Sequence, residues 1–170
     1  LLLLLGALVA LEIHRVGQPI RVEEIPAWRV TEKEPVHWLL QSIEDQNRKT
    51  DVWIEGPVNR HSCDTLIMVA GVEEGSDFLL INESVSKRAY TMLMQQPIRD
   101  FARPETFAHW GLLKMLNFPT EVRKEFIQNI GALKALLDHI NLQAKTVPSR
   151  FSGRVVLAGG SLGAPIPAIF

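Results

Sequence analysis

The sequence contains a single cysteine, Cys63, among its 170 residues. That scarcity excludes an intrachain disulfide framework and any metal site built from several cysteines. An excess of charge is also missing, since 18 Lys and Arg stand against 19 Asp and Glu and leave a net charge of −1. Without a basic surface field, nucleic acid is not expected as a partner. The hydrophobic content of 46% and charged content of 22% are ordinary for one globular domain with a substantial core.

No apolar run in the sequence is long enough to cross a bilayer, which takes about 20 residues. The longest run opens the chain at residues 1–11 and consists mainly of leucine. It has the length and composition of a signal-peptide core or of the remainder of an anchor, so residues 1–15 are predicted to be a signal or anchor remnant. Membrane association and an anchored or exported location are then expected. The alternative is a buried N-terminal helix, with a cytoplasmic location.

The next part of the chain indicates an extended lead-in followed by a hairpin. Residues 16–35 contain Pro19 and Pro26, which break any helix, and are predicted to be extended. Residues 36–43 and 51–55 have the apolar and aromatic content of strands, and a polar loop joins them. An antiparallel hairpin is therefore predicted at the start of a domain that spans residues 36–170.

Strands and helices alternate along the rest of the chain. Continuous apolar runs predict strands buried on both faces, and three- and four-residue spacing of apolar residues predicts helices. The predicted elements are a strand at 65–71, a short helix at 76–87, a strand at 89–94, a helical piece at 106–116, a long helix at 120–142 and a strand at 154–158. This order predicts an α/β fold with a mostly parallel sheet, an antiparallel hairpin at its N-terminal side and flanking helices.

The helix at 120–142 has the strongest pattern of all. Thr120 is predicted to be its N-cap. The apolar stripe that should face the core comprises Val122, Phe126, Ile130, Leu133, Leu137 and Ile140.

The last predicted strand runs into Gly159-Gly160-Ser161-Leu162-Gly163, a Gly-x-Ser-x-Gly motif. Such a motif after a buried strand is typical of a nucleophile elbow, where the chain turns sharply from strand to helix with the serine at the apex. Glycines flank the serine because a Cβ would clash in so tight a turn.

Together with the run 66–72 and the segment 96–100, this motif resembles the α/β-hydrolase superfamily of esterases, lipases and acyl peptidases over residues 36–170. The resemblance implies the truncated, N-terminal half of that fold. It implies that Ser161 attacks an acyl carbon and that the Leu162 N–H and the Val72 N–H stabilise the oxyanion. The expected reaction is hydrolysis of a small-molecule ester, thioester or amide through an acyl-enzyme, without a cofactor. Ala70-Gly71 stands where the family usually has His-Gly.

The resemblance also shows what the chain lacks. In this family the catalytic acid and histidine follow the serine, but residues 162–170 contain no Asp, Glu or His. The chain is therefore expected to be a fragment that is inactive by itself. The five histidines are predicted to be structural or solvated, with His139 on the exposed side of the long helix beside Asp138; the others are His14, His37, His61 and His109.

Two other classes of protein remain open from the residues alone. The first is a non-catalytic α/β binding or interaction module whose glycine turn is purely structural. The second is a nucleotide- or phosphate-binding protein with the glycine turn at a helix N-terminus. A metal site at His61, Cys63 and Asp64 is disfavoured because all three lie in one loop without a distant fourth ligand.

Overall fold

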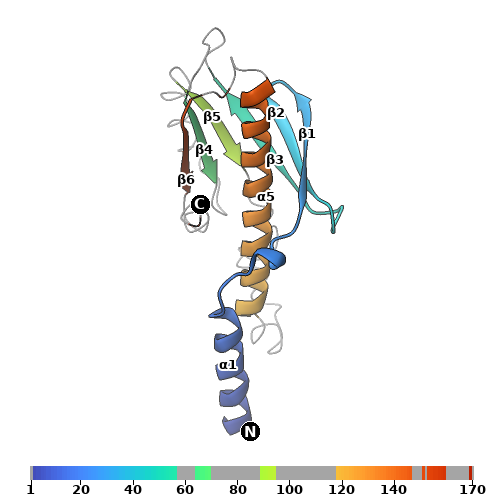
Figure 1. Cartoon of the computed structure of the whole chain (residues 1–170). Coiled ribbons are helices and arrows are strands. Elements are labelled where there is room, and N and C mark those ends of the chain that lie inside the picture. Colours follow the sequence, from blue (N-terminus) through green and yellow to red (C-terminus); the bar gives the residue numbers. More distant parts are fainter. Residues whose placement is uncertain are drawn as a thin grey trace, which may run out of the picture.

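The computed structural model describes residues 2–56, 64–69, 89–94, 118–146, 151, 153–159 and 169. Within this part of the chain, six strands form one sheet in the order β1-β2-β3-β5-β4-β6, and a long helix, α5, lies across one face (Figure 1). The strands are β1 (Trp28–Glu34), β2 (His37–Ser42), β3 (Lys49–Glu55), β4 (Thr65–Val69), β5 (Tyr90–Met94) and β6 (Val155–Gly159). The helices are α1 (Leu2–Val16), the single 3₁₀ turn η1 (Val22–Glu24) and α5 (Phe118–Thr146).

The sheet is mixed. β1 pairs with β2, β2 with β3 and β3 with β5 in antiparallel fashion, whereas β4 pairs with β5 and with β6 in parallel. The predicted α/β class and the predicted hairpin, β2–β3, are confirmed. The expectation of a mostly parallel sheet is wrong for the described strands, because antiparallel pairs outnumber parallel ones. β1 extends the hairpin on one side, and β3 continues the antiparallel pairing to β5 on the other.

The extended lead-in at residues 16–35 contains a strand, β1, that its sequence did not indicate. β1 is an edge strand, and it buries only Trp28 fully and Val30 partly while its other residues are exposed. A strand that hides so few side chains leaves only a weak alternating pattern in the sequence. A register shift between Glu32 and Glu34 then bends its end.

α5 is the predicted long helix, extended by two residues at its start and by four at its end. Thr120 is therefore not the N-cap but the third residue of the helix. Leu136 is fully buried whereas the neighbouring Leu137 is only partly so, and Val122 is 39% exposed. Ile130, Leu133 and Ile140 are buried as predicted, and Phe126 is partly buried against the core.

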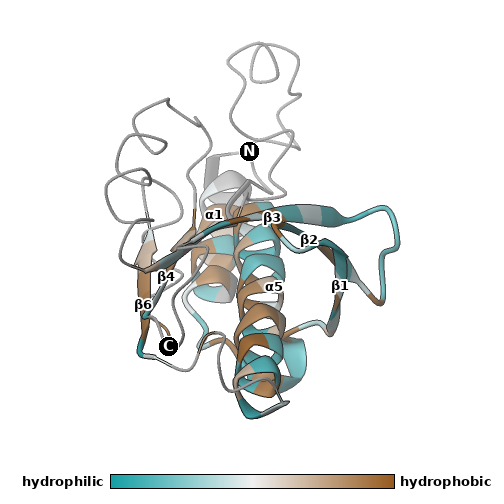
Figure 2. Ribbon diagram, turned by 90° about the horizontal axis from the view of Figure 1, so that it is seen from above, coloured by the Kyte–Doolittle hydropathy of each residue, from teal (hydrophilic) through white to brown (hydrophobic). Residues whose placement is uncertain are grey.

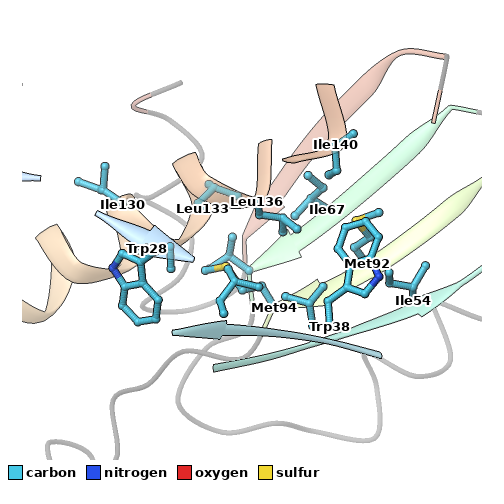
Figure 3. Packing of buried hydrophobic residues seen from close by; sticks show 14 of the residues in the cluster. Trp28, Trp38, Ile54, Ile67, Met92, Met94, Ile130, Leu133, Leu136 and Ile140 are labelled. Carbon is cyan, nitrogen blue, oxygen red and sulfur yellow. The ribbon is translucent and has the colours of Figure 1, made fainter. Parts of the chain in front are cut away.

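The core lies between α5 and the sheet. Figure 3 shows Leu133 and Leu136 of α5 directed at Met94, Ile67 and neighbouring side chains from the sheet. Hydropathy along α5 alternates between hydrophobic and hydrophilic segments, as expected for a helix with one buried face (Figure 2). Trp38 and Phe151, both almost fully buried, meet edge to face at a centroid distance of 5.7 Å.

Residues 2–16 form a helix, α1, that extends away from the sheet beside the start of α5 (Figure 1). The carboxylate of Glu12, which is only 8% exposed, accepts hydrogen bonds from the N–H of Thr120, at 3.0 Å, and from its hydroxyl. It thereby satisfies an N–H in the first turn of α5 that has no partner within the helix. Among the helices that the structure describes, none combines the length and apolarity needed to cross a membrane.

Several predicted elements lie outside the described residues. They are the short helix at 76–87, the helical piece at 106–116 and the glycine-rich elbow from residue 160 onward.

Candidate functional site

The carboxyl ends of β4 and β6 lie next to each other. The two strands pair in parallel from Thr65 opposite Val155 to Val69 opposite Gly159. Neighbouring strands are separated by about 4.8 Å, so the last described residues of these two strands lie side by side at one edge of the sheet. The segment that contains Val72 follows β4, and the segment that contains Ser161 follows β6.

The three predicted site residues lie outside the described part of the chain, so the structure gives only their points of attachment. Ser161 follows Gly159 by two residues and Val72 follows Val69 by three. An extended chain covers at most about 3.6 Å per residue. Ser161 is thus tethered within about 7 Å of the end of β6, and Val72 within about 11 Å of the end of β4.

β4 also marks a change in the direction in which the chain moves across the sheet. The chain proceeds from β4 to its neighbour β5 on one side and later returns to β6 on the other side. In open α/β sheets, ligands bind outside the carboxyl ends of the strands at such a switch point. The edge formed by the ends of β4 and β6 is therefore the candidate functional site.

An ion pair, Asp64–Arg154, links the opposite ends of these two strands and is called the clamp below. Asp64 precedes β4 and Arg154 precedes β6; Asp64 Oδ1 accepts the Arg154 backbone N–H at 2.8 Å, and its Oδ2 accepts from the guanidinium at 2.8 Å. The Thr65 N–H donates to the Arg154 carbonyl, and the Tyr90 N–H donates to that of Asp64. The clamp thus lies at the start of the parallel ladder that ends with Val69 opposite Gly159.

The clamp changes the ionisation of its carboxylate. The side-chain hydrogen bond from Arg154, followed by its backbone hydrogen bond, holds the pKa of Asp64 below its usual value. Sequence reasoning missed this pair. The available signal was an acidic and a basic residue placed immediately before two strands that were predicted to be buried and parallel.

The same clamp bears on the disfavoured metal site. Both carboxylate oxygens of Asp64 are engaged by Arg154, while His61 and Cys63 lie outside the described residues. Across the described ranges, no group of three or more His, Cys, Asp or Glu side chains is placed to hold a metal ion.

The histidines that the structure describes have other partners. His14 is within 3.2 Å of the Gln18 side chain on α1. The prediction for His139 is wrong, because its side chain is only 20% exposed and faces the sheet. His139 Nε2 lies 2.8 Å from Glu32 Oε1, and its ring meets Trp38 edge to face at 4.9 Å.

His37 forms a small cluster on strands β2 and β3. Its Nε2 lies 2.8 Å from Asp51 Oδ1, and its ring stacks on Trp53 at a centroid distance of 4.2 Å. A histidine beside a carboxylate has the composition of a catalytic dyad, but β3, β5 and β4 all lie between β2 and β6 in the sheet. At about 4.8 Å for each step from strand to strand, His37 is about 19 Å from β6, well beyond hydrogen-bond reach of its carboxyl end.

The sequence matches no protein-family model and no curated protein sequence. A comparison with solved structures finds similarity to Est1E from Butyrivibrio proteoclasticus, with 13% sequence identity and a TM-score of 0.42. The aligned region covers 81% of this chain and 42% of that one. The chain thus spans less than half of the length of the structure that it matches.

Proposed function

We propose that this chain is the N-terminal half of a serine hydrolase of the α/β-hydrolase type. Ser161 is the nucleophile, and the N–H groups of Leu162 and Val72 stabilise the oxyanion. The reaction is hydrolysis of a small-molecule ester, thioester or amide through an acyl-enzyme, with no cofactor.

The observation that carries this proposal is the register of β4 against β6, with Val69 opposite Gly159. A serine nucleophile and its oxyanion donors act on one carbonyl group, so they must come from segments that meet at one point. Val72 and Ser161 follow two adjacent strand ends within a few residues. Their separation by some ninety positions in the sequence is therefore no obstacle to a shared site.

The chemistry requires a base that removes the proton from the Ser161 hydroxyl. His14, His37 and His139 are held by partners on α1, β2–β3 and β1–β2 respectively. His61 and His109 lie outside the described residues, and both precede Ser161 in the sequence. Because the histidine and its acidic partner follow the serine in the superfamily, we propose that both come from sequence beyond Phe170.

A fluorophosphonate probe tests the nucleophile, because it reacts covalently with an activated serine and with little else. The full-length protein should be labelled, and Ser161→Ala should abolish labelling while thermal unfolding stays unchanged. Ser42→Ala is the matched control, since Ser42 is buried in β2 and should not affect labelling.

A folded full-length protein that resists labelling would contradict the proposal and favour a binding module with a structural glycine turn. Labelling that persists in Ser161→Ala would place the nucleophile elsewhere in the protein.

We also propose that α1 attaches the protein to a membrane surface. Gly6–Leu11 are all exposed although none is charged, and Leu8, Leu11 and Ile13 are 48%, 63% and 64% exposed. A helix segment that is apolar on every side is stable only in an apolar environment. Flotation with phosphatidylcholine vesicles should carry the wild-type protein upward and leave a Leu8→Ser, Leu11→Ser variant behind; equal behaviour of the two would refute this role.

A further inference from the structure

The outer edge of β1 has no partner strand in the part of the chain that the structure describes. β1 is the first strand in the sheet order and pairs only with β2. The Ile43 N–H donates to the Ala27 carbonyl, which fixes which residues turn their backbone groups toward β2. Because this direction alternates along an antiparallel pair, the N–H and C=O groups of Trp28, Val30 and Glu32 point away from β2.

The straight part of this edge is short and has a defined centre. Pro26, which has no N–H, lies before it, and the register shift between Glu32 and Glu34 ends it. Val30 is the middle of the stretch between these limits. If β1 paired with β1 of a second copy about Val30, the outward backbone groups of the whole stretch would form hydrogen bonds.

A groove of about 370 Å³ runs along this edge, between β1 and α5. Its apolar wall includes Pro26, Trp28, Val30 and Ala135, and Leu142, which is 58% exposed, lies at its rim. An added strand would direct alternate side chains toward the same face as Trp28 and Val30, which is the face covered by α5.

Two opposite charges lie on the α5 rim of the groove. Lys134 and Asp138 are one helical turn apart, both line the groove, and their side chains are 54% and 65% exposed. Within one chain they form an ion pair at 2.7 Å. If a second copy of the chain were related to the first by a two-fold axis at Val30, its α5 would run in the opposite direction. Lys134 of each copy would then face Asp138 of the other.

We propose that β1 and α5 form a symmetric interface with a second copy of this chain. β1 pairs with its symmetry mate in antiparallel fashion about Val30, and the two sheets become continuous. The register about Val30 sets Arg29 opposite Thr31 and Trp28 opposite Glu32 of the second copy, so no like charges stand directly opposite each other. The interface is isologous, because the same patch serves both copies.

Charge complementarity favours a second copy over an unrelated peptide. The rim carries Lys134 and Asp138, which are similarly exposed. A second copy related by a two-fold axis presents an Asp138 to each Lys134, so the patch is complementary to itself. Leu142 of the second copy then approaches the end of the groove near Pro26, where it covers apolar surface.

Sedimentation velocity on the full-length protein tests the proposal. The wild type should sediment as a dimer, and Val30→Pro should be monomeric because proline removes the outward N–H at the centre of the pairing. Proline is tolerated on the free side of an edge strand, so the melting temperature of Val30→Pro should stay close to that of the wild type once the loss of dimer is taken into account. Val30→Ala is the matched control, since it shortens the side chain, keeps the N–H and should remain dimeric.

Charge reversal gives a second measurement that does not depend on proline. Lys134→Asp or Asp138→Lys should each weaken dimerisation by about tenfold, and the double variant should restore it because the exchanged charges are again complementary. The Leu8→Ser, Leu11→Ser double variant should leave the dimer intact. It therefore distinguishes dimerisation through β1 and α5 from self-association through α1. A wild type that is monomeric at high concentration, or a dimer that survives both Val30→Pro and the single charge reversals, overturns the proposal.

Discussion

At Gly131, α5 packs closely against the chain that leads into β1. A Cβ added there would lie 2.6 Å from the carbonyl oxygen of Pro26 and 2.9 Å from Cδ1 of Trp28. Neither neighbour can move freely, since the first is backbone and Trp28 is only 7% exposed. Gly131→Ala therefore forces α5 and the start of β1 apart.

The magnitude follows from two opposing contributions. Alanine in place of glycine inside a helix stabilises it by about 1 kcal/mol. Overpacking a filled site costs about 1–3 kcal/mol. The net prediction is that Gly131→Ala lowers the free energy of unfolding by up to about 2 kcal/mol, whereas helix propensity alone predicts an increase.

Urea unfolding followed by tryptophan fluorescence measures this difference. Gly6→Ala is the matched control, because a Cβ added at Gly6 would have no atom within 4 Å and the same exchange there meets only open space. Gly6→Ala should leave the midpoint unchanged or raise it. If Gly131→Ala raises the midpoint as much as helix propensity predicts, the close packing of α5 on β1 is refuted.

Three other perturbations probe separate parts of the fold. Leu136→Ala, at a fully buried position, should destabilise the protein by about 2–5 kcal/mol in thermal unfolding. Leu142 is 58% exposed, so Leu142→Ala should change the stability of the monomer little. Equal losses for the two variants would contradict the placement of the core. Asp64→Asn should destabilise the protein near neutral pH, because the pKa of Asp64 is lowered by its hydrogen bonds from Arg154 and its stabilising effect is present above the unfolded-state pKa. The stabilisation by Asp64 is lost as the pH falls through its folded-state pKa, so the unfolding curves of Asp64→Asn and the wild type should converge in acid. A stability difference that persists in acid would argue against the clamp. Glu12→Ala should detach α1 from α5 and increase hydrogen exchange in α1 while leaving the sheet protected; unchanged exchange would show that the carboxylate does not hold α1.

Sequence patterns located those elements whose side chains are buried on a regular repeat. β4, β5 and β6 are continuous apolar runs in the sequence, and α5 repeats its buried residues at three and four positions, so all four were predictable to within a few residues. The prediction that the last strand is buried on both faces is wrong, because none of its residues is fully buried and Val156 is 51% exposed. β1 was not predictable, because an edge strand exposes most of its side chains and its pattern is weak. The prediction that His139 is exposed was wrong for a related reason. Its hydrogen-bond partner, Glu32 on β1, lies far from it in the sequence, so no local pattern indicated that this polar residue faces the sheet.

The sequence alone therefore determined the α/β class, the hairpin, the long helix and the Gly-x-Ser-x-Gly motif after a strand. All of these depend on neighbours along the chain, on side-chain periodicity and on the local chemistry of a turn. Only the tertiary structure decided the strand order, the Asp64–Arg154 clamp and the pairing of Val69 with Gly159. These depend on contacts between segments about ninety residues apart, whose energies no local pattern records. The serine motif is thus a property of the sequence, while the adjacent strand ends that would give it an oxyanion partner are a property of the fold.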